Sequence, residues 1–154
     1  MIGFMARLRA WSLMSVACVA MVCGIGVERA EAQARPLVIR SDPGGLLGAR
    51  SKEIRRLRAS GERVELRGTC NSACTMYLGL ANVCVDRRAS FGFHGPSWYG
   101  KALPPTQFEH WSVVMADSYK EPLRSWFMNT ARYEIRGHIR LSGAELIRLG
   151  YAEC

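Results

Sequence analysis

The sequence has no block of Lys and Arg residues, no basic motif interleaved with aromatic side chains, no internal repeat and no low-complexity tract. Its formal net charge is nevertheless +8. A basic surface can attract anionic partners such as nucleic acid or lipid headgroups. Because the arginines are scattered along the chain, we interpret them as solvated surface charge and expect no nucleic-acid partner.

The chain also lacks an unbroken hydrophobic run of the length that a membrane anchor needs. The apolar stretch 11–27 is short and is interrupted by serines and glycines. Arg7 and Arg9 precede it, and Ala-x-Ala sites follow it up to Ala34, which is the pattern of a secretory signal peptide. We therefore predict that residues 1–34 are a cleaved signal peptide. The mature protein is expected to be periplasmic or secreted, without a stable membrane anchor.

The remaining 120 residues, 35–154, have the length of a single domain. The predicted cleavage removes three arginines and two glutamates, which leaves 18 basic and 11 acidic residues and a net charge of +7. Hydrophobic periodicity and turn residues predict a strand at 37–40, a helix at 46–59, a strand at 64–67, a buried helix at 73–81, strands at 83–85 and 90–94, and then C-terminal helices. This order is an α/β fold with a β-α-β-α-β-β core.

Several details of these helices can be read from the side chains. Thr106 with Glu109, and Ser142 with Glu145, form capping-box patterns that predict two helix starts. The first helix places leucines and Ile54 on one face and basic residues elsewhere. The basic residues that we expect to be solvated are Arg50, Lys52, Arg55 and Arg58.

Four cysteines follow the predicted cleavage site: Cys70, Cys74, Cys84 and Cys154. An even number in an exported protein predicts at least one disulfide, and three pairings are possible. We favour Cys70–Cys84, because these residues lie on consecutive predicted strands. No second ligand pair at zinc-site spacing accompanies Cys70 and Cys74, so we expect no metal. Their Cys-x-x-x-Cys spacing also differs from the Cys-x-x-Cys of thiol oxidoreductases, which leaves redox activity as a weaker alternative.

The stretch 68–94 carries the strongest functional pattern. Ser72 stands at a Gly-rich turn between a predicted strand and a predicted helix, and His94 ends a later strand. Several hydrolases present a nucleophilic serine in this way, with a histidine base on a neighbouring strand. A helix start also offers N–H groups that stabilise negative charge. The structural alternative is that Ser72 is only a helix N-cap and His94 only the end of a strand.

Three segments with their order and spacing resemble the Clp protease proteolytic subunit and its periplasmic relatives, within the ClpP/crotonase-like fold. They are the loop Ser41-Asp42-Pro43-Gly44-Gly45, the turn Gly68-Thr69-Cys70-Asn71-Ser72, and Phe93-His94. A C-terminal segment, Leu141-Ser142-Gly143-Ala144-Glu145 followed by Gly150, is similar to that family as well. The resemblance covers residues 37–153 and implies a small ClpP/crotonase-like domain at 35–154.

The resemblance implies a role for individual residues. Ser72 would be the nucleophile and His94 the general base, and the N–H groups of Gly44 and Ala73 would form the oxyanion hole. The substrate would be a peptide or protein, no cofactor would be needed, and the chain would form homo-oligomers. Such chemistry is consistent with the residues, because a serine hydroxyl needs a base and the tetrahedral intermediate needs two donors.

The third member of the triad departs from the family pattern. His138 stands where the family has an aspartate, and no carboxylate lies between Ile135 and Arg140. Asp117 and Glu134 are candidates to replace it from another direction. We therefore predict an exported serine hydrolase of the peptidase type with an atypical third member. The alternative is a catalytically inactive ClpP-like protein for binding or assembly. Trp98 and Tyr99, which follow His94 closely, either border a substrate cleft or pack locally.

Overall fold

The computed structural model describes residues 35–154. The predicted signal peptide at 1–34 lies outside the described residues. Across 35–154, no helix combines the length and the apolar character that crossing a membrane requires.

The described residues form a mixed α/β domain, in agreement with the predicted class. Its strands are β1 (Leu37–Asp42), β2 (Val64–Asn71), β3 (Val83–Val85), β4 (Ser90–Phe93), β5 (Ser97–Trp98), β6 (Lys101–Ala102) and β7 (Ile139–Ser142). Its helices are α1 (Leu47–Ser60), the 3₁₀ helix η1 (Ser72–Gly79), α2 (Pro105–Ala116), α3 (Leu123–Asn129), the 3₁₀ helix η2 (Ala131–Tyr133) and α4 (Gly143–Arg148).

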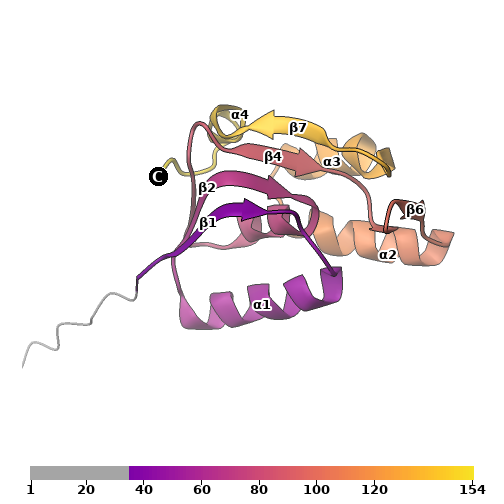
Figure 1. Ribbon diagram of the computed structural model, residues 1–154, viewed down its shortest axis with the longest axis horizontal. Coiled ribbons are helices and arrows are strands. Elements are labelled where there is room, and N and C mark those ends of the chain that lie inside the picture. Colours follow the sequence, from indigo (N-terminus) through magenta and orange to yellow (C-terminus); the bar gives the residue numbers. More distant parts are fainter. Residues whose placement is uncertain (1–34) are drawn as a thin grey trace, which may run out of the picture. The chain divides into compact units, whose positions relative to one another are not determined.

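A five-stranded sheet organises the domain, with the order β1-β2-β4-β7 (Figure 1). The fifth strand, β3, pairs with the first half of β2. Strands β1, β2, β3 and β4 run parallel, and β7 returns antiparallel to β4. The carboxyl ends of parallel strands lie at one edge of a sheet, which is where α/β proteins place their sites. The turns after β1, β2 and β4 therefore meet at this edge.

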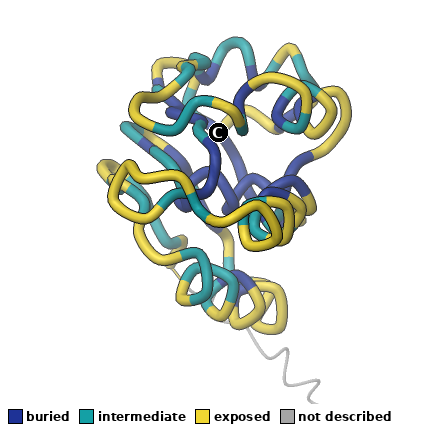
Figure 2. The backbone as a smooth tube through the Cα atoms, turned by 90° about the vertical axis from the view of Figure 1, so that its right-hand side faces the viewer, coloured by how far each residue is buried: buried dark blue, intermediate teal, exposed yellow. Residues whose placement is uncertain are grey.

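The core lies between the sheet and the helices. In Figure 2 the dark-blue buried segments run through the middle of the tube, and the yellow exposed segments lie around them. β2 and β4 contribute the fully buried Leu66, Phe91 and Phe93, and α1 contributes Ile54 and Leu57. The aromatic rings of α3 and of the segment after α2 pack edge-on against Phe93.

The second helix differs from the expected one. Residues 73–78 and Leu80 are buried as predicted, whereas Ala81 is exposed, and the helix is a 3₁₀ helix over Ser72–Gly79. Apolar composition reports burial and does not distinguish i+3 from i+4 hydrogen bonding, so the sequence pattern could not reveal this. A second difference is β7, a strand that was not predicted. In it Ile139 and Leu141 alternate with polar residues over only four positions, and the strand completes the sheet by pairing with β4.

The two capping-box predictions have opposite outcomes. Ser142 and Glu145 form the predicted box, with the Glu145 N–H donated to Ser142 Oγ at 3.2 Å and the Ser142 N–H donated to Glu145 Oε2 at 2.7 Å. The Thr106–Glu109 prediction is wrong, because α2 begins at Pro105 without a side-chain cap. Glu109 instead pairs with Arg132 at 2.8 Å.

Disulfides are present as predicted, but the favoured pairing is wrong. The bonds are Cys70–Cys74 and Cys84–Cys154. β2 and β3 are indeed neighbours, yet their register places Cys84 beside Glu65. Cys70 lies five residues further along β2, which at about 3.3 Å per residue is roughly 17 Å away. A Cys70–Cys84 bond therefore cannot form in this register.

Candidate functional site

Ser72 occupies the turn at the end of β2, and its backbone has φ of 56°. A positive φ is uncommon for a residue with a side chain and costs conformational energy, so the surrounding structure must hold it. Asn71, which precedes η1, makes no side-chain capping bond, and Ser72 is already the first residue of η1. The interpretation of Ser72 as a simple N-cap is therefore wrong. Ala73 follows it and is fully buried in the first turn of η1.

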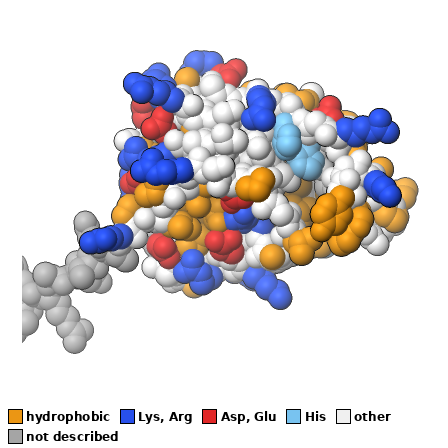
Figure 3. Space-filling model, in the orientation of Figure 1, with side chains coloured by type: hydrophobic (Ala, Val, Ile, Leu, Met, Phe, Trp, Pro, Cys, Tyr) orange, Lys and Arg blue, Asp and Glu red, His pale blue; other side chains and the backbone are white. Residues whose placement is uncertain are grey.

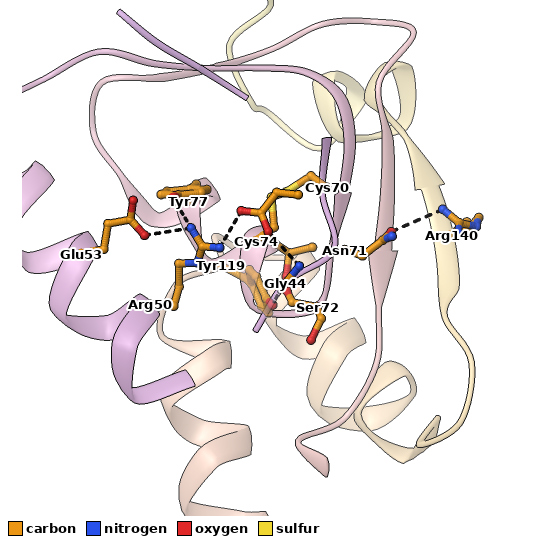
Figure 4. The surroundings of a disulfide bond; sticks show 12 residues. Gly44, Arg50, Glu53, Cys70, Asn71, Ser72, Cys74, Tyr77, Tyr119 and Arg140 are labelled. Carbon is orange, nitrogen blue, oxygen red and sulfur yellow. Dashed lines mark hydrogen bonds and ion pairs between the residues drawn. A yellow bond between two sulfur atoms is a disulfide. The ribbon is translucent and has the colours of Figure 1, made fainter. Parts of the chain in front are cut away.

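The loop after β1 lies directly against this turn. A Cβ atom placed on Gly44 would be 2.6 Å from Ser72 Cβ and 3.1 Å from Ser72 Oγ, so only glycine fits there. Gly44 has φ of 107°, a conformation that other residues rarely adopt. Its N–H is donated to Asp42 Oδ1 at 2.8 Å, as Figure 4 shows beside Ser72. In this conformation, the Gly44 N–H thus faces Asp42.

Ser72 and His94 line one cavity of about 380 Å³. His94 immediately follows β4, which is paired in parallel with the end of β2. Gly45 and Leu46 line the cavity from the loop after β1, and Ile135 from the segment after η2. Among the described residues no hydrogen bond joins Ser72 to His94, and hydrogen bonds between catalytic groups are often loose without substrate.

His94 is surrounded by few polar partners. Its Nδ1 atom is buried and has no hydrogen-bond partner within residues 35–154. Burial lowers the pKa of His94, and the neighbouring His138 acts in the same direction. The two imidazole rings meet edge to face, with their centroids 4.9 Å apart. A histidine with a lowered pKa is neutral at neutral pH and can accept a proton.

The three candidates for the third member lie in different places. His138 lines the cavity and contacts His94. Glu134 is close enough for its charge to raise the pKa of His94, but its carboxylate accepts the N–H groups of Arg136 and Gly137, at 2.9 and 2.7 Å. These backbone bonds lower the pKa of Glu134.

Asp117, in contrast, is not brought to the cavity. It lies at the C-terminal end of α2 and pairs with Arg124 at 2.7 Å. It lines two other surface depressions and not the one that holds Ser72 and His94.

A partly buried ionic network that was not predicted from the sequence lies next to the turn. Arg50 of α1 pairs with Asp42 at 2.5 Å and with Glu53 at 2.9 Å, and it also donates to the hydroxyl of Tyr77 (Figure 4). Its side chain is only 10% exposed, so the prediction that it is solvated is wrong. The helical periodicity did contain the signal, because Arg50 lies three residues after Leu47 and four before Ile54, on the apolar stripe.

On the side of the turn away from the Gly44 loop, residues of β4 and of the segment that leads into β7 pack against Asn71. A Cβ atom on Gly92 would lie 2.4 Å from Asn71 Oδ1 and 2.9 Å from His138 Cδ2, so both side chains lie against the Gly92 backbone. Arg140 donates a long hydrogen bond of 3.4 Å to Asn71 Oδ1. The absence of a side chain at Gly92 thus lets His138 reach His94.

Trp98 and Tyr99 form an aromatic rim on the cavity. Both line it from the β5–β6 hairpin, and they are 58% and 86% exposed. Figure 3 shows histidine side chains on this face of the molecule, with hydrophobic side chains gathered beside them. The rim supports the expectation that these two residues border a cleft.

No model of a known protein family matches this chain, and no curated protein sequence matches it either. The assignment of a function therefore depends on the geometry of the cavity.

Proposed function

We propose that the mature domain is an exported serine hydrolase that cleaves peptides or proteins through an acyl-enzyme intermediate. Ser72 is the nucleophile and His94 is the general base. The observation that carries this proposal is the strained turn of Ser72 in a cavity that it shares with His94. Burial lowers the pKa of His94, which favours the neutral form that a general base needs. Residues held at a positive φ by their surroundings are concentrated at functional sites.

The chemistry requires each part of this arrangement. His94 takes the proton from Ser72 Oγ as the hydroxyl attacks the scissile carbonyl, and later returns it to the leaving amine. The Ala73 N–H lies in the first turn of η1, where N–H groups have no partner within the helix, and it is one candidate donor to the oxyanion. The Gly44 N–H is the second candidate, and it must turn from Asp42 to serve.

Substrate class and partners follow from the same proposal. The aromatic rim and the apolar residues of the cavity suit an extended peptide, whose side chains would contact Trp98 and Tyr99. The two disulfides are compatible with an oxidising compartment, and export to the periplasm or the exterior is part of the proposal. The ClpP/crotonase-like relationship and self-association remain predictions.

Covalent labelling with a fluorophosphonate tests this function. The mature wild-type protein should be labelled on Ser72, and Ser72→Ala should not be labelled. His94→Ala should be labelled at least about 1,000-fold more slowly than the wild type, because Ser72 and His94 act as a unit. Ser125→Ala, an exposed serine on α3, is the matched control and should be labelled like the wild type. Wild-type protein that stays unlabelled, or is labelled elsewhere, would contradict the proposal.

The second candidate is a catalytically inactive peptide-binding protein of the same fold. It is favoured by one observation, namely that His94 Nδ1 has no carboxylate bonded to it in the part of the chain described. An orienting carboxylate fixes the histidine tautomer, and its loss costs orders of magnitude in rate. In that case Ser72→Ala should bind peptides as tightly as the wild type, with neither protein labelled.

A further inference from the structure

The Cys70–Cys74 disulfide forms a ring with Ser72 at its centre. Cys70 lies on β2 and Cys74 lies in the first turns of η1, with their Cα atoms 5.3 Å apart. Ser72 is thus two residues from each cysteine. Figure 4 shows the bond next to the Ser72 turn and Gly44.

Both cysteines are anchored in the core. Cys70 is 1% exposed and is paired in register with Asp42 of β1 and Phe91 of β4. Cys74 is fully buried. The two ends of the five-residue ring are therefore fixed by the sheet and by η1, and the residues between them have little freedom.

The other interactions around the Ser72 backbone are noncovalent. Its carbonyl accepts the hydroxyl of Thr75 at 2.7 Å, and Gly44 lies against its side chain. On the N-terminal side, Asn71 is paired with Gly92 of β4, and its carbonyl lies against Gly44. The disulfide is the covalent restraint that spans the residue on both sides.

We propose that Cys70 and Cys74 are positioning residues, whose disulfide holds Ser72 in its left-handed conformation and so directs its hydroxyl into the cavity with His94. This inference rests on the proposed function where it concerns reactivity. Its conformational part stands independently of catalysis. Opening the bond lets Ser72 relax towards a negative φ, and a displacement of about 1 Å in a nucleophile costs on the order of 100-fold in rate.

The second disulfide provides a matched control. Cys84–Cys154 joins β3 to the C-terminal segment, away from the cavity. The test compares Cys70→Ala/Cys74→Ala with Cys84→Ala/Cys154→Ala, both oxidised. Two quantities are measured, the φ of Ser72 from NMR coupling constants and carbon shifts, and the rate of fluorophosphonate labelling.

We expect Cys70→Ala/Cys74→Ala to lose the positive φ of Ser72 and to be labelled about 100-fold more slowly. The control pair should keep both properties of the wild type. A positive φ that persists without the Cys70–Cys74 bond would overturn the inference. If the wild type is not labelled at all, the proposed hydrolase function fails, whereas the φ measurement still decides whether the disulfide holds Ser72.

A second arm leaves Cys70 and Cys74 unsubstituted. Cys84→Ala/Cys154→Ala retains only the Cys70–Cys74 bond, so comparing its oxidised form with its phosphine-reduced form isolates this bond. Reduction should abolish the positive φ while circular dichroism shows a folded domain. If the open form unfolds in both arms, the bond supports the whole fold rather than the turn, and the inference is wrong.

Discussion

The two disulfides lie near opposite ends of β2 and close loops of very different length. Cys70–Cys74 joins residues four positions apart, whereas Cys84–Cys154 joins residues seventy positions apart. In the chain-entropy model, a disulfide destabilises the unfolded state more when it closes a longer loop. The short bond restricts only the turn around Ser72, and the long bond restricts most of the domain. A disulfide can thus position one residue at the end of β2 and stabilise the whole domain at its start.

The surroundings of the two disulfides also differ in how far their charged side chains are buried. Near Cys70 lie a partly buried ionic network and a residue with a positive φ. Near Cys154 lies an exposed ion pair, in which Arg87 meets Glu153 at 2.7 Å. A preorganised site needs side chains that are held in place by packing. An exposed ion pair contributes little to the free energy of unfolding.

The largest expected effect concerns the stability difference between the two bonds. Cys84→Ala/Cys154→Ala should lower the free energy of unfolding by about 4 kcal/mol, and Cys70→Ala/Cys74→Ala by about 2 kcal/mol. The reason is the loop length that each bond closes. Urea unfolding of the oxidised proteins measures both values. Equal losses of unfolding free energy, or a larger loss for the short loop, would show that loop length does not determine how much each disulfide stabilises the domain.

The ionic network at the Ser72 end should also matter more than the ion pair at the other end. Arg50→Met removes the partner of Asp42 and should destabilise the domain by about 3 kcal/mol, since a partly buried carboxylate is left unpaired. Arg87→Met is the matched control on an exposed ion pair and should leave the urea midpoint unchanged within error. A similar shift of the urea midpoint in both variants would show that the partly buried ion pair contributes no more to stability than the exposed one.

The smallest effect concerns protonation in the cavity. His94 should titrate below the ordinary histidine value of about 6.5, because burial and His138 both lower its pKa. His138→Asn should raise the pKa of His94, since one source of positive charge is removed, while the charge of Glu134 continues to act in the raising direction. NMR titration of the imidazole measures the shift. His110→Asn, on the surface of α2, should leave it unchanged, and a downward shift in His138→Asn would contradict the interpretation.

Residue patterns predicted the frame of the domain because they report local preferences and burial. The alternation at Val64 and Leu66 gave the start of β2, and the Ser142–Glu145 pattern gave the start of α4. β7 was not predicted, since four residues carry too weak a signal by themselves. Pairing with β4 supplies the backbone partners that make it a strand.

The cavity was predictable only in part. The order of the Gly44 loop, Ser72 and His94 led to residues that line or adjoin one cavity. The disulfide partners were not predictable, because they depend on the register of β2 with β3 and on where the C-terminal segment lies. The Asp42–Arg50 pair likewise depends on how α1 packs against the end of β1.

The antiparallel pairing of β7 with β4 has a consequence for folding. β4 contains Phe91 and Phe93, both fully buried in the finished domain. Until β7 docks, about fifty residues later in the chain, this strand presents open hydrogen-bonding groups along one edge. Open edges of this kind pair readily with other copies of a chain. The interval before β7 pairs with β4 is therefore an aggregation-prone stage of folding.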